Sequence, residues 1–185
     1  MTLPDAPLVN PLDAVAGIAA LFAAWRGYRR GLSAEFWPLL SVVGAAASAF
    51  WCAHRGREWL ISHTRLTYET AGALAFTAGA AGGFLAVILA ALAIRLVVSL
   101  RFNDAIEKPG GLIAGVAGGL LAIFLIFASV ILWPHDYLRL HFGERSLVGR
   151  GTTFILRWRG FDIGQPAPAG APHTKEPATA TSIEI

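Results

Sequence analysis

Six charged residues lie at the edges of apolar segments, where ionisable side chains are rare. They are Asp13, Arg26, Arg30, Glu35, Glu107 and Lys108. Because a charge at membrane depth is costly, such residues usually pair with one another or line a water-filled cavity. We therefore hypothesise a polar cluster on one face, in which Glu35 and Glu107 pair with arginines. The alternative is that these side chains lie at head-group depth and only cap helices, since a carboxylate near a helix N-terminus is favourable.

The remaining reactive side chains do not form the pattern of an enzyme. The five histidines fall in predicted loops or in the C-terminal tail, and none has the zinc-enzyme spacing of two histidines four apart beside a glutamate. The sequence contains neither a Gly-x-Ser-x-Gly elbow nor a phosphate-binding loop. Its single cysteine, Cys52, excludes an intrachain disulfide. We therefore expect a protein that is not an enzyme and that needs no cofactor or metal.

The composition indicates a membrane protein. Of the 185 residues, 55% are hydrophobic and only 15% are charged, whereas a soluble domain has about 25% charged residues. Four apolar segments, at residues 12–28, 34–53, 71–98 and 110–133, approach or reach the roughly 17–25 residues that span a bilayer. Continuous runs rich in Ala, Leu and Gly favour helices over a membrane barrel. The prediction is an all-α, polytopic protein with a four-helix transmembrane bundle in residues 1–134. The alternative is the buried core of a soluble protein, which would leave these helices little amphipathic cover.

Small residues recur at four-residue spacing in three of these segments. They are Gly44 and Ser48, then Gly79 and Gly83, then Gly111, Gly115 and Gly119. On a helix this spacing places them along one face, and small side chains there let two helices approach closely. One interpretation is tight helix packing, including self-association; the other is the lining of a pore or transport path.

The C-terminal part differs in composition. Residues 135–162 include five arginines among aromatic and aliphatic residues, which suits either a basic amphipathic segment on a membrane surface or a short extension packed on the bundle. Residues 163–185 are rich in Pro, Ala and Thr, and we expect them to be disordered. The basic turn at 26–30 predicts a cytoplasmic location for that turn, although arginines in the opposite loop weaken this orientation. No basic stripe on a polar face points to nucleic acid.

Two groups of these residues resemble motifs of the colicin V production protein family. The first group is Asp13, Arg26-Gly27-Tyr28, Arg30-Gly31 and Glu35. The second is Glu107-Lys108, where the family has Asp-Arg, followed by Gly111, Gly115 and Gly119. The resemblance covers about residues 10–133. Pro109 and Gly110 follow the charged pair as unusual helix breakers, and Gly118 stands where an arginine is common.

The resemblance implies a small multi-pass protein of the bacterial inner membrane with four helices. It also implies a non-catalytic helper in toxin production or export, or in envelope homeostasis. The expected partners are the lipid bilayer and either a second copy or another membrane protein, and we expect no nucleic-acid partner. Two alternatives stay open: a small transporter or channel, and a membrane scaffold that binds a partner through residues 139–159.

Overall fold

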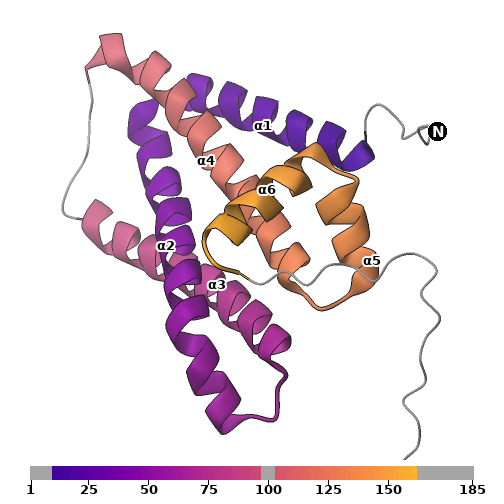
Figure 1. Ribbon diagram of the computed structural model, residues 1–185. Coiled ribbons are helices and arrows are strands. Elements are labelled where there is room, and N and C mark those ends of the chain that lie inside the picture. The colour runs from indigo at the N-terminus through magenta and orange to yellow at the C-terminus, as the bar shows by residue number, and fades with distance from the viewer. Residues whose placement is uncertain (1–9, 97–102, 162–185) are drawn as a thin grey trace, which may run out of the picture.

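The computed structural model describes residues 10–96 and 103–161, and these residues form helices and no strand (Figure 1). Four long helices come first: α1 (Pro11–Arg30), α2 (Leu32–His63), α3 (Tyr68–Arg95) and α4 (Asp104–Leu132). A short helix α5 (Asp136–Leu138), a π-helical turn η1 (Arg139–Glu144) and the helix α6 (Leu147–Trp158) follow. The expected all-α class is confirmed for this part of the chain. The tail expected to be disordered, 163–185, lies outside the described residues.

Three of the long helices are long and apolar enough to cross a membrane. They are α2, α3 from Tyr68 to Ile94, and α4 from Ala105 to Leu132. The first helix is not among them, and it carries Asp13 in its first turn and Arg29 and Arg30 in its last. The chain therefore has the helices of a multi-pass membrane protein, and three of the four predicted spans meet these criteria within the described residues.

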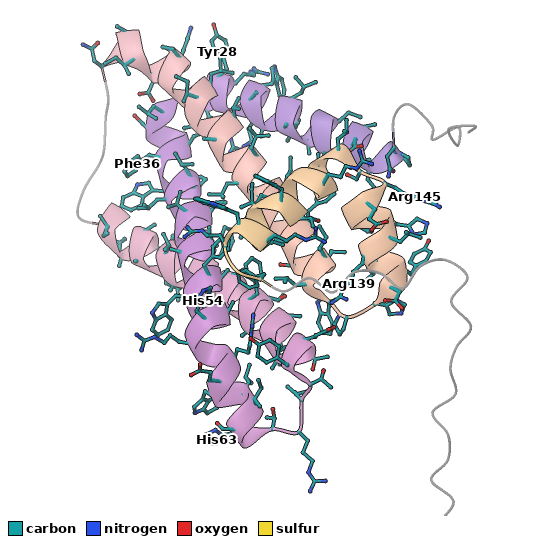
Figure 2. The ribbon with its side chains drawn as sticks, in the orientation of Figure 1. Tyr28, Phe36, His54, His63, Arg139 and Arg145 are labelled. Carbon is teal, nitrogen blue, oxygen red and sulfur yellow. The ribbon has the colours of Figure 1, made fainter. Side chains whose placement is uncertain are left out.

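Two helix boundaries differ from the prediction by six residues or more. The second helix continues past residue 53 to His63, so that His54 and His63 lie on α2 and not in a loop (Figure 2). The prediction was wrong because apolarity ends near Ala53, whereas the helix continues through polar residues that pack beside α3. The fourth helix begins at Asp104, not 110, because the Asn103 side chain caps it by accepting the Ala105 amide at 3.2 Å.

The helices pack in close pairs through their small residues. A Cβ atom on Gly79 would lie 2.8 Å from the Ser48 carbonyl oxygen, and one on Gly83 would lie 2.9 Å from that of Gly44. These distances leave no room for a side chain, so α2 and α3 approach backbone to backbone as an antiparallel pair, which Figure 1 shows as a long hairpin.

The first and fourth helices form a second antiparallel pair. A Cβ atom on Gly115 would lie 3.0 Å from the Gly27 Cα atom, and one on Gly119 would lie 2.7 Å from the Ala23 Cβ atom. A Cβ atom on Gly111 would lie 2.7 Å from the Gly31 Cα atom. The predicted glycine stripe of α4 therefore packs against α1 of the same chain.

The last helix crosses the bundle and closes its core. Leu156 of α6 is fully buried, and Phe161 beyond its end packs against Phe50 and Phe76, with ring centroids 5.9 and 6.2 Å apart. The opposite face of α6 exposes Phe154 and Trp158, at 73% and 79%. One face of α6 therefore packs on the bundle, and the rest of its surface exposes large apolar side chains together with Arg150 and Arg157.

Candidate functional site

The turn between α1 and α2 brings three helix ends together. A single residue, Gly31, connects the two helices with φ +79°, a left-handed value that glycine adopts readily. Glycine is also required here because of space: a Cβ atom at this position would lie 2.6 Å from the Oε1 atom of Glu107. The turn therefore accommodates the beginning of α4 at the point where α1 becomes α2.

Glu107 of α4 caps the N-terminus of α2. Its Oε1 atom accepts the backbone amide of Ser33 at 3.0 Å, and its Oε2 atom accepts the Ser33 hydroxyl at 2.9 Å. The residue at the cap position of α2, Gly31, has no side chain to satisfy these first amides. A carboxylate at this position also interacts favourably with the helix dipole. The sequence-based hypothesis pairs Glu107 with an arginine, whereas the structure pairs it with a helix end.

Arg26 and Glu35 form an ion pair across the same turn. The Arg26 Nε atom donates to Glu35 Oε1 at 3.0 Å, and Nη2 donates to Oε2 at 3.0 Å. Glu35 is only 3% exposed, while the Arg26 side chain is 41% exposed. A carboxylate this deeply buried needs a charged partner, and the two parallel hydrogen bonds are the strong bidentate arrangement of an arginine. The pair holds the C-terminal part of α1 against the first turn of α2.

A cavity of about 170 Å³ opens beside this pair, between α1, α2 and α4. Arg26 and Glu35 contribute its charged wall, and Leu39, Gly115 and Gly118 contribute to its apolar wall. The space is large enough for several water molecules. One charged wall in an otherwise apolar cavity is the usual arrangement for orienting a small polar solute or a partner's side chain.

The other predicted charges do not join this cluster. Arg30 and Lys108 are exposed and form no ion pair within the described residues. Asp13 lies thirteen residues before Arg26, about 20 Å away along α1 at 1.5 Å per residue. The six predicted residues thus separate into a core of Arg26, Glu35 and Glu107 at the turn, two exposed bases, and one distant acid.

Asp13 instead caps α6. It accepts the Ser146 hydroxyl at 2.6 Å and the amides of Leu147 and Val148 at 3.0 and 3.1 Å. Ser146 is fully buried and also accepts the amide of Gly149 at 3.1 Å. The charged end of α1 therefore holds the start of α6 in place.

The sequence indicates Ser33 as a possible cap of the second helix, but Ser146 was missed. A serine immediately before the first turn of a helix is a recognised capping signal, so Ser146 could also have been marked as a helix start. Their partners could not, because Glu107 and Asp13 are 74 and 133 residues away in the chain. No group of three or more potential metal-ligating side chains occurs within the described residues.

One family model matches the chain. It is described as colicin V production protein, and the match runs over residues 12–148, which include every residue of the turn and the cap of α6. Comparison with curated proteins and with solved structures finds no match.

Proposed function

Because the chain belongs to the colicin V production protein family, we propose that it is a non-catalytic, multi-pass protein of the bacterial inner membrane. In this proposal it supports toxin production or export, or envelope homeostasis. The observation that carries the proposal is the ion pair between the buried Glu35 and the half-exposed Arg26, in the wall of the cavity between α1, α2 and α4. Burial of a carboxylate costs stability even when it is paired, and a charge in a membrane-spanning helix usually marks a functional position.

The use of the acidic residues supports a non-catalytic role. Glu35, Glu107 and Asp13 each accept two or more hydrogen bonds that fix one helix against another. A general acid or base must instead reach the atom whose proton it transfers. Carboxylates engaged in this way suit a site that holds helices and contacts a partner.

A complementation assay tests the proposal. A strain that makes colicin V but lacks its own member of this family would receive this chain or an empty vector, and toxin in the medium would be measured. We expect toxin release with the chain and not with the empty vector. Failure to restore release, with the chain present in the membrane at the level of the native member, would contradict a role in toxin production.

We also propose that α1 crosses the membrane as the fourth span of the bundle. It runs antiparallel beside α4, and its 20 residues extend about 30 Å, the thickness of a bilayer core. Its outer face exposes large apolar side chains over about three turns, which suits contact with lipid: Val15, Ile18, Leu21, Phe22 and Trp25. Reporter fusions test this, since a crossing by α1 places the N-terminus and the turn at Gly31 on opposite sides of the membrane. Finding both on one side would contradict it.

A small transporter or channel is the second candidate function, and the cavity of about 170 Å³ favours it. Its test is flux into vesicles that contain the purified chain, compared with vesicles that contain the Glu35→Gln variant.

The scaffold alternative has less support, because Arg139 is buried against Glu69 and Arg159 lies over the ring of Phe50. Those side chains are engaged within their own chain.

A further inference from the structure

Two arginines converge at the end of the bundle opposite the Gly31 turn. Arg57 comes from the polar end of α2, and Arg139 comes from η1, and both line a small cavity with Glu69 and Phe161. Figure 2 labels Arg139 where the chain returns to the bundle after α4. The Nε atoms of both arginines are buried and have no hydrogen-bond partner, and Arg139 as a whole is only 9% exposed. Since buried N–H groups are nearly always paired, these two require an acceptor.

The charges around this cavity do not balance. Arg139 donates from Nη2 to Glu69 Oε2 at 3.1 Å. Arg57 has no carboxylate partner among the described residues; its Nη1 atom donates to the Tyr68 hydroxyl at 2.5 Å, and its guanidinium lies over the Tyr68 ring. Two cations against one carboxylate leave one positive charge. The missing acceptor is therefore expected to be an anion, since water would satisfy the N–H groups but not the charge.

The position of the cavity, at the ends of two membrane-spanning helices, indicates which kind of anion could reach it. It lies where α3 begins, at Tyr68, and where α4 ends, at Leu132. Both helices are membrane-spanning by length and composition, so their ends lie at head-group depth. Exposed aromatic side chains surround this end, with Trp59 at 61%, Tyr68 at 59% and Trp133 at 42%, as is typical of a membrane–water interface. The partly positive N-terminus of α3 adds to the attraction for an anion.

We propose that Arg57 and Arg139 form a binding site for a phosphate group, with one phosphate oxygen in the cavity that both side chains line. The cavity is about 20 Å³, which suits one oxygen atom. The rest of the phosphate lies at the mouth, beside Tyr68 and the half-exposed Glu69 side chain. Arginine is well suited to this ligand because its planar donor groups match phosphate oxygens. The phosphate belongs to an anionic lipid head group or is free in solution, and the experiment separates these sources.

Binding by the full chain, purified in an uncharged detergent, tests the site. The probes are a short-chain phosphatidylglycerol, inorganic phosphate, and dioctanoylglycerol as a lipid without phosphate, each titrated by calorimetry. We expect binding of phosphatidylglycerol or inorganic phosphate and none of dioctanoylglycerol. Binding of the lipid alone identifies a head-group site, and equal binding of inorganic phosphate identifies a free-phosphate site; both results support the proposal. If neither phosphate probe binds, the proposal is overturned.

Three variants connect the binding to the two arginines. Arg57→Gln should weaken the affinity about tenfold, the value of one hydrogen bond to a charged group. Arg55→Gln is the matched control, because Arg55 is an exposed arginine two residues away on α2. Glu69→Gln should strengthen binding, since it removes the carboxylate that competes for Arg139. Equal affinities for Arg57→Gln and Arg55→Gln contradict the site. Should Arg57→Gln fail to fold, an unchanged affinity in Glu69→Gln contradicts it instead.

Discussion

Arg26 and Glu35 join α1 to α2 through two hydrogen bonds of 3.0 Å, and the two partners differ sharply in exposure. The Glu35 side chain is 4% exposed and that of Arg26 is 41% exposed. The buried carboxylate therefore needs the guanidinium to offset its loss of hydration, whereas the guanidinium is still partly hydrated without the carboxylate. This asymmetry predicts which half of the pair the fold can lose more easily.

Replacing each partner in turn tests the asymmetry. Arg26→Gln leaves a buried carboxylate without its countercharge, whereas Glu35→Gln leaves an arginine that can turn toward water. We expect Glu35→Gln to lower the free energy of unfolding by about 1–3 kcal/mol and Arg26→Gln to lower it more. Unfolding in mixed micelles, followed by circular dichroism, measures both. A smaller loss for Arg26→Gln than for Glu35→Gln would contradict the burial of Glu35.

Two adjacent glycines of α3, Gly83 and Gly82, provide a test substitution and its control for the close contact between α2 and α3. Gly83→Ala places a Cβ atom 2.9 Å from the carbonyl oxygen of Gly44, so the two helices must separate. Gly82→Ala meets nothing within 4 Å. We expect Gly83→Ala to lower the free energy of unfolding by about 1–3 kcal/mol and Gly82→Ala to leave it unchanged or raise it slightly. Similar effects of the two substitutions on thermal unfolding would rule out close packing at Gly83.

The cap that α4 provides for α2 is tested by Glu107→Ala. This change removes both acceptors from Ser33 and should lower the free energy of unfolding by about 1–2 kcal/mol, as for other lost helix caps. The neighbouring Lys108→Ala removes an exposed charge with no ion pair in the described residues and serves as the control. Chemical denaturation of both variants under the same conditions measures the difference. Equal stabilities would show that the Glu107–Ser33 contact contributes little.

The cap that α1 provides for α6 is tested by proteolysis. Asp13→Ala removes three hydrogen bonds at the start of α6, so this helix should open more often. We expect trypsin to cleave after the exposed Arg150 and Arg157 faster than in the unmodified chain, because cleavage follows the population of the open state. Ser146→Ala should have a similar effect. Unchanged cleavage rates in both variants would contradict the contact.

Local features of the site could be predicted from the sequence, and distant ones could not. Arg26 and Glu35 are nine residues apart on either side of Gly31, so a turn alone brings them together. The partners of Glu107 and Asp13 depend on how α4 and α6 fold back, which no spacing reveals. The predicted end of α2 was wrong for a related reason, since six of its last ten residues are charged or polar and this part of the helix packs beside α3.

The glycine pattern shows the same limit. Four-residue spacing correctly indicates a face for close packing, because that property depends on one helix alone. It does not indicate which helix occupies the face. Gly115 contacts Gly27, and Gly83 contacts Ser48; these pairings depend on how distant helices fold back on one another, which the spacing within one helix does not show.

We propose that the Arg26–Glu35 pair is the functional site of the protein, and toxin release per membrane-resident copy tests this most directly. The complementation strain would receive the chain as it is, Glu35→Gln, and the doubly exchanged Arg26→Glu with Glu35→Arg, with membrane abundance measured in parallel. We predict that Glu35→Gln releases much less toxin per copy and that the exchanged pair recovers part of the loss. Release per copy equal to that of the unmodified chain in Glu35→Gln would contradict the claim.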